Sequence, residues 1–333
     1  EWRYAADLMA RHGPSLILRG DTATLQELVG RLPAELVQAD PELVLLGAAD
    51  RILSGDPEAA AANLVAAPQG ARPSEQRGGR FALLRATVST ALAWQVGDLD
   101  QVLVAGVEAL ALQSQVATDG EGDDARAITL FTVGAAELWA GHLDSAELHL
   151  REGLAVAVQA GLTLLEFSCL NQLALLHALR GEPREALRWG TNAVEMTAEE
   201  TWSSSMQAAG GHLALAWVAY YQDDLRDASR HADQAAAASG VGWQPMALAV
   251  AILRARLQRA RGDLAGSLST VAAARRDLAG WTAPLYLRRW LLVTEAELRG
   301  AAGQAQSASA IREGLEGSGP LSGGEAVVLA RLE

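Results

Sequence analysis

Residues 173–194, LALLHALRGEPREALRWGTNAV, contain the pattern that decides the fold of this chain. An apolar stretch leads to Gly181, and the acidic residue Glu182 follows directly. Glycine commonly ends a helix because it adopts the left-handed conformation without a steric penalty. An acidic residue at the start of the next helix complements the helix dipole. Apolar side chains then return at helical spacings, as in Leu187 and Val194. The stretch therefore predicts a helix, a tight turn and a second helix.

The same turn recurs about every 40 residues, which is typical of a repeat protein. The turn positions are Gly20, Gly55, Gly97, Gly141, Gly181, Asp223, Gly262 and Gly303. Ala174, Ala186 and Ala193 mark one repeat at seven residues before, five after and twelve after its turn, and most repeats have small residues there. Small side chains let two helix axes approach to about 8–10 Å. We therefore expect an all-α chain of about eight helical hairpins.

Two polar stretches are expected to be loops between hairpins, residues 68–80 and 119–124. Because each joins one hairpin to the next, we expect a single superhelical body over residues 1–316. Residues 317–333 are expected to form a hinge and the start of a further domain, since glycine and serine are frequent from residue 314 to 324.

The composition excludes several classes of function. The net charge is −13 and the pI is about 5.0, so we expect the chain itself not to bind nucleic acid or an anionic membrane. All 27 basic residues are arginine, which excludes a P-loop lysine and a Schiff-base lysine. The single cysteine, Cys169, excludes an intrachain disulfide and indicates a reducing, cytoplasmic compartment. The apolar stretch 213–221 is too short to span a bilayer.

No catalytic motif is present, and the sequence contains neither a zinc-protease HExxH nor a CxxC nor a nucleophile-elbow GxSxG pattern. The acidic loop at 119–124 lacks the ligand spacing of a calcium loop, and Gly240-Val241-Gly242 lacks the context of a dinucleotide site. His142 and His149 share a helix without a third metal ligand. We therefore predict that the chain is not an enzyme, and that it holds no metal and no cofactor.

The periodic small residues resemble those of the tetratricopeptide repeat, although the repeat here is longer than that family's. The resemblance implies a right-handed superhelix whose first helices line a concave groove. Applied to this chain, it places one set of residues in the groove: Trp94, Gln95, Phe131, Trp139, Asn171, Gln172, Trp217, Tyr220, Tyr221, Arg256, Trp290 and Glu297. An aromatic groove of this kind suits a sugar, a planar metabolite or an apolar peptide, and suits phosphate poorly.

Within this set, the expected main contacts are Trp94, Trp139, Trp217 and Tyr221, with Asn171 and Gln172 as polar partners. A second tryptophan set, Trp202, Trp243 and Trp281, recurs in register with the repeat and is expected to be structural core. Cys169 is expected to be a buried apolar filler.

Both ends of the chain resemble a second, related family. The N-terminal motifs resemble the opening of the MalT-like helical-repeat region of ATP-dependent LuxR-family transcription activators: RHG (11–13), LRGD (18–21), LP (32–33) and PEL (41–43). Residues 320–332 resemble the first helix of a LuxR-type helix-turn-helix, with Ser322 and Glu325 at capping-box spacing. The resemblance implies that the chain is part of a longer protein, with an ATP-binding module before residue 1 and a DNA-binding domain after residue 333.

The resemblance thus predicts a non-catalytic sensor that binds a small-molecule inducer in the groove and takes part in self-association. DNA would be contacted only through a domain outside this chain. The alternative is a tetratricopeptide-type scaffold that binds a peptide or partner protein. An extended peptide in the groove would favour that alternative.

Overall fold

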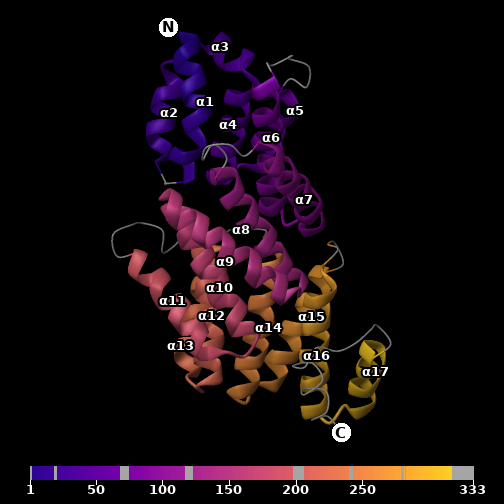
Figure 1. Ribbon diagram of the computed structural model, residues 1–333. Helices are drawn as coiled ribbons and strands as arrows, with labels where there is room; N and C mark the ends of the chain where they lie inside the picture. The colour runs from indigo at the N-terminus through magenta and orange to yellow at the C-terminus, as the bar shows by residue number, and fades with distance from the viewer. Residues whose placement is uncertain are drawn as a thin grey trace. The chain divides into compact units, whose positions relative to one another are not determined.

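A computed structural model describes residues 2–18, 21–67, 75–116, 123–197, 206–239, 243–278, 281 and 283–316. These residues form helices joined by short turns, and the described part of the chain contains no β-strand (Figure 1). The expected all-α class is confirmed.

The helices follow one another as eight hairpins. The first helices are α1 (Trp2–Leu18), α4 (Pro41–Leu53), α6 (Glu75–Val96), α8 (Asp123–Ala140), α10 (Thr163–Leu179), α12 (Ala209–Tyr221), α14 (Gln244–Ala260) and α16 (Leu285–Ala301). The second helices are α2 (Thr22–Gly30), α5 (Pro57–Ala66), α7 (Leu99–Val116), α9 (Leu143–Ala160), α11 (Pro183–Thr197), α13 (Leu225–Ala238), α15 (Leu264–Asp277) and α17 (Ala305–Glu316). Two short elements, α3 (Ala34–Ala39) and the 3-10 helix η2 (Met206–Ala208), lie between hairpins.

The predicted turn positions have the left-handed backbone conformation. Their φ angles lie between 63° and 88° at the seven turn positions within the described residues, from Gly55 to Gly303. At Gly181, the N–H of Glu182 donates to the carbonyl of His177 at 2.9 Å, and the N–H of Gly181 donates to Ala178 at 3.1 Å. This pair of bonds is the Schellman motif, which satisfies helix-end carbonyls. The sequence signature therefore marks the helix ends.

The acidic residue after the turn caps the next helix with its side chain. Asp56, Asp224 and Asp263 accept hydrogen bonds from backbone N–H groups in the first turns of α5, α13 and α15, at 3.0, 3.0 and 2.8 Å. These caps satisfy N–H groups that have no partner inside the helix. From the sequence we expected these acidic residues to complement the helix dipole, and the side-chain caps are an additional finding.

The periodic small residues are buried where the two helices of a hairpin cross. Ala48, Ala60, Ala186 and Ala228 are buried. In the hairpin α14–α15, Ser267 Oγ donates to the carbonyl of Ala255 at 2.6 Å, so positions five after and seven before the turn meet directly. The predicted close crossings are thus present.

Contacts group the chain into two compact units, and each is described by itself below. The first unit is Glu1–Leu138 with Leu143–Cys169, and the second is Trp139–His142 with Leu170–Glu333. Within the second unit, α14 lies between α12 and α16 and packs against both. The right-handed superhelix stays a prediction.

The predicted loops are shorter than expected. Helix α6 begins at Glu75, so residues 75–80 are helical, and α8 begins at Asp123. Asp124 in the first turn of α8 complements the helix dipole and favours a helix start within the expected loop. Helix α17 continues to Glu316, past the start of the glycine-rich tract. Residues 68–74, 117–122 and 317–333 lie outside the described residues.

Candidate functional site

The predicted groove residues lie on six first helices. Trp94 and Gln95 lie on α6, Phe131 and Trp139 on α8, Asn171 and Gln172 on α10, Trp217, Tyr220 and Tyr221 on α12, Arg256 on α14, and Trp290 and Glu297 on α16. Their exposure differs widely, since Trp139 is 0% and Trp217 2% exposed, whereas Tyr221 is 50% exposed. Gln95, Tyr220, Arg256, Trp290 and Glu297 are partly buried, and the remaining members are buried.

The second unit brings several of these aromatic residues together. We call Tyr286, Trp290, Trp217, Tyr220 and Tyr221 the aromatic row. The ring centroids of Trp217 and Trp290 are 5.2 Å apart with planes at 28°, and those of Trp217 and Tyr221 are 5.7 Å apart at 34°. Tyr286 stacks on Trp290 at 6.2 Å and 29°, and Tyr220 meets Trp217 edge-on at 5.7 Å. Offset stacked and edge-on contacts are the favourable geometries for aromatic pairs.

The row forms because aromatic side chains from two helices meet across a third helix that lies between them. Trp217 lies on α12 and Trp290 on α16, and α14 lies between these helices. The two indoles meet over α14, where Arg256 places its Cζ 5.8 Å from the Trp217 ring centroid. Aromatic stacking therefore joins α12 to α16, and α14 takes part through the Arg256 guanidinium.

One carboxylate beside the row, that of Glu297, is shared by two arginines, and Arg259 Nη1 lies 3.9 Å from its Oε1. Arg256 Nη2 lies 3.0 Å from Glu297 Oε2, and its Nε donates to Thr294 Oγ1 at 3.2 Å. Burial raises the pKa of the Tyr221 phenol, while Arg256 acts in the opposite direction. The phenol therefore stays protonated at neutral pH and can donate a hydrogen bond.

Trp139, at the end of α8, forms a separate aromatic pair with Trp243. Its ring centroid is 5.3 Å from that of Trp243, with planes at 80°. Next to it, a Cβ added at Gly141 would lie 2.7 Å from Cγ of Tyr286. The α8–α9 turn thus contacts the start of α14 and the start of α16, all within the second unit.

Three buried polar atoms in the predicted set have no hydrogen-bond partner among the described residues: Trp139 Nε1, Gln172 Oε1 and Trp217 Nε1. Leaving a buried donor or acceptor unsatisfied costs about 1–3 kcal/mol. Two indole donors and one amide acceptor of the second unit are therefore buried without a hydrogen-bond partner among the described residues.

The other predicted residues take packing positions. Trp94 and Phe131 form an edge-on pair in the first unit, with centroids 6.2 Å apart. Asn171 lies against α12, because a Cβ added at Gly211 would overlap its Oδ1. Gln172 Nε2 would lie 3.2 Å from a Cβ at Gly210. The expected amide pair is thus held where α10 meets the start of α12.

Tyr286 is the residue of the row that sequence reasoning missed. It lies four residues before Trp290, and this spacing places two side chains on one helix face. Trp243, expected to be core, is buried, and Trp281 is partly buried. Trp202 lies outside the described residues.

The remaining candidates for chemistry have structural partners. Cys169 is buried, and burial raises the pKa of its thiol, which disfavours the nucleophilic thiolate. His142 is exposed just before α9, and His149 Nδ1 lies 2.7 Å from Glu137 Oε2. Within the described part of the chain, no three His, Cys, Asp or Glu side chains lie close enough together to bind a metal ion.

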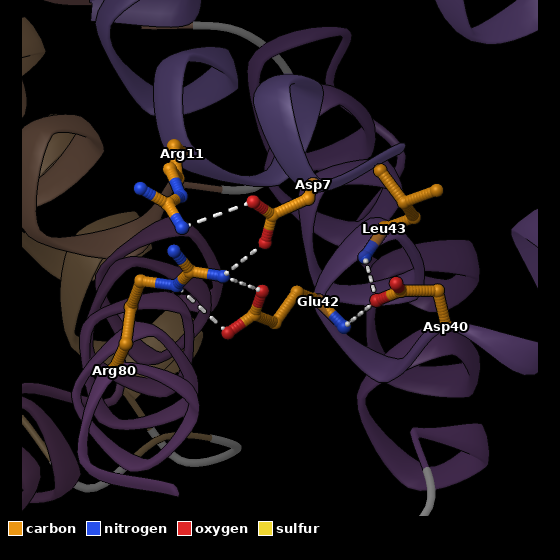
Figure 2. Close-up of polar contacts among 6 residues, drawn as sticks. All are labelled: Asp7, Arg11, Asp40, Glu42, Leu43 and Arg80. Carbon is orange, nitrogen blue, oxygen red and sulfur yellow. Dashed lines mark hydrogen bonds and ion pairs between the residues drawn. The ribbon is translucent and has the colours of Figure 1, made fainter. Parts of the chain in front are cut away.

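A charged cluster in the first unit joins α1, α4 and α6 (Figure 2). Arg80 Nε donates to Glu42 Oε1 at 2.9 Å, and Arg80 Nη2 bonds Glu42 Oε2 and reaches Asp7 Oδ1 at 3.4 Å. Arg11 pairs with the other Asp7 oxygen at 3.0 Å, and Asp40 caps α4. Because Glu42 is 3% exposed, Arg80 neutralises a buried carboxylate. The cluster is a structural tie between repeats.

No helix in the described part of the chain combines the length and the apolar character needed to cross a membrane. In comparisons with known proteins, no protein-family model matches the chain and no curated protein is significantly similar to it.

Proposed function

We propose that this chain is the ligand-sensing and self-association region of a LuxR-family, MalT-like transcription activator, and that its inducer binds at the aromatic row. The observation that carries the proposal is the stacking of Trp217 and Trp290 across α14, with Tyr221 half exposed beside them. The family assignment itself rests on the sequence motifs at the two ends of the chain. The ATP-binding and DNA-binding modules that it implies lie outside this sequence.

The row has the character of a recognition surface. Aromatic faces supply contact area for flat or apolar ligands, and the half-exposed Tyr221 phenol supplies a donor for an acceptor atom. Trp139 and Trp217 are covered by neighbouring side chains, so a ligand reaches the row through Tyr221, Tyr220 and Trp290. The neutral Arg256–Glu297 pair disfavours phosphate and other anions.

The proposed mechanism is a change in how neighbouring hairpins pack. A ligand on the row contacts α12 and α16 together, and these helices belong to different hairpins with α14 between them. Its binding energy therefore favours one relative placement of the hairpins. Coupling energies between a ligand site and a distant response are typically about 1–3 kcal/mol. The response would be altered repeat curvature or self-association.

The test is a titration of candidate inducers followed by tryptophan fluorescence, comparing the wild type with Tyr221→Ala. Loss of one aromatic contact of about 1.4 kcal/mol should weaken binding about tenfold. Tyr4→Ala is the matched control, because Tyr4 is 70% exposed on α1 and belongs to the first unit, whereas the row belongs to the second. Equal affinities in all three proteins would refute the site. Binding of an extended peptide in place of small molecules would support the scaffold alternative.

A further inference from the structure

The α8–α9 turn is packed differently from four other hairpin turns of the chain. At Gly141, an added Cβ would lie 2.7 Å from Cγ and 2.8 Å from Cβ and Cδ2 of Tyr286. At four other turn glycines an added Cβ would meet nothing within 4 Å: Gly55, Gly181, Gly262 and Gly303. Tyr286 therefore lies directly on the backbone of this turn, in space that any side chain at position 141 would fill.

Tyr286 also stacks on an aromatic residue of the row. Its ring is 6.2 Å from Trp290 with planes at 29°, and Trp290 in turn stacks on Trp217. The Gly141 backbone and the Trp290 ring thus form a seat for one flat ring. In this structure the seat is filled by a side chain of the protein itself.

Tyr286 lies in the first turn of its helix, at a partly exposed position. It is the second residue of α16, and the N-cap residue Pro284 makes no side-chain capping hydrogen bond. Leu285 beside it is 55% exposed, and Tyr286 is partly exposed. First turns of helices open more easily than helix interiors, because several of their N–H groups lack partners within the helix.

The surroundings define the chemistry of a competing ligand. The guanidinium that lies over Trp217, that of Arg256, pairs with Glu297 at 3.0 Å and donates to Thr294 at 3.2 Å. The seat itself is made of backbone and an indole face, which favours an uncharged flat ring. We infer that Tyr286 is an internal competitor for the inducer, and that the inducer is an uncharged planar aromatic molecule whose ring replaces that of Tyr286. This inference rests on the proposed function of the row.

The test uses 4-methylphenol, the tyrosine side chain as a free molecule, as the probe. Tyr286→Ala opens the seat, so it should bind 4-methylphenol at least about tenfold more tightly than the wild type, where the probe must displace Tyr286. Adding Trp290→Ala removes one wall and should abolish the gain. Tyr4→Ala serves as the control for loss of an exposed tyrosine elsewhere. Binding is measured by saturation-transfer NMR and tryptophan fluorescence.

Equal affinity of Tyr286→Ala and the wild type for the probe would overturn the inference, as would an undiminished gain in the double variant. If Tyr286→Ala lost its helical circular dichroism, Tyr286→Ser, which also leaves the seat open, would replace it with the same expectations. In the wild type, saturating 4-methylphenol should speed hydrogen exchange over residues 286–290, and unchanged exchange would also contradict the inference. Failure of the proposed function would give a different result. Tyr221→Ala would then bind the inducer as the wild type does, while Tyr286→Ala would still bind 4-methylphenol more tightly than the wild type.

Discussion

Gly134 tests the close helix crossings most directly. It lies seven residues before the turn at Gly141, inside α8. A Cβ at this position would lie 2.9 Å from Cγ of Leu150, 3.1 Å from its backbone N and 3.2 Å from the carbonyl oxygen of Ala146. Two of these three atoms belong to the backbone of α9, so they cannot rotate away as a side chain could. Gly134→Ala should therefore force the two helices apart.

The expected magnitude is a balance of two opposing effects. Alanine gains about 1 kcal/mol over glycine in a helix interior, while overpacking costs about 1–3 kcal/mol. The net loss therefore lies between about 0 and 2 kcal/mol. Because backbone atoms resist displacement, we expect Gly134→Ala to lower the free energy of unfolding by about 1–2 kcal/mol. The assay is thermal unfolding followed by circular dichroism, with about 2–4 °C expected per kcal/mol for a body of about 150–250 residues.

The matched control is Gly314→Ala in α17. Gly314 is exposed, and an added Cβ meets nothing within 4 Å. The same chemical change should therefore raise stability by about 0.5–1 kcal/mol, the helix-propensity gain alone. If Gly134→Ala were as stabilising as Gly314→Ala, the crossing at Gly134 would not be tight and the packing argument would be wrong.

Three further changes test the tie between repeats, a titrating pair and a turn. Arg80→Met leaves the buried Glu42 carboxylate without its main partner, so it should lower the free energy of unfolding in urea by about 2–4 kcal/mol. Arg11→Met removes the more exposed ion pair with Asp7 and should lower it by less than about 1 kcal/mol. The hydrogen bond to Glu137 raises the pKa of His149 above its ordinary value of 6.5, so its stabilisation is complete below that value and is lost as pH rises through the folded-state pKa. His149→Gln should thus flatten the fall in stability as pH rises above the ordinary histidine pKa of 6.5, and an unchanged pH profile would contradict this. Asp223 has φ of 63° without being glycine, so Asp223→Gly should raise the melting temperature by relieving about 1 kcal/mol of strain, and a lowered one would count against the turn assignment.

The fold was readable from the sequence because its determinants are local. A glycine that must adopt positive φ, and a carboxylate that caps the helix after it, act within a few residues of each other. The non-glycine turn at Asp223 was found by register alone, and the structure gives it the same conformation. The helix starts at Glu75 and Asp123 were missed because glycine, proline and acidic residues obscure the helical pattern there.

The sequence predicted the candidate site only in part. Counting from the turns placed Trp217, Tyr220, Tyr221 and Trp290 on first helices, and the structure stacks them together. Sequence could not show that Trp139 and Trp217 are buried while Tyr221 is exposed. Neither could it show that Tyr286 packs on Gly141, since that contact joins residues far apart in the chain.

The sequence by itself determined the number of hairpins, their turns and the positions where helices touch. These depend on backbone conformation and side-chain size, which each short segment carries on its own. The tertiary structure alone decided which aromatic rings meet across α14, which polar atoms are left without partners, and which ring lies on the α8–α9 turn. Those outcomes depend on how neighbouring hairpins pack, and packing is set by the sum of many small contacts between distant segments.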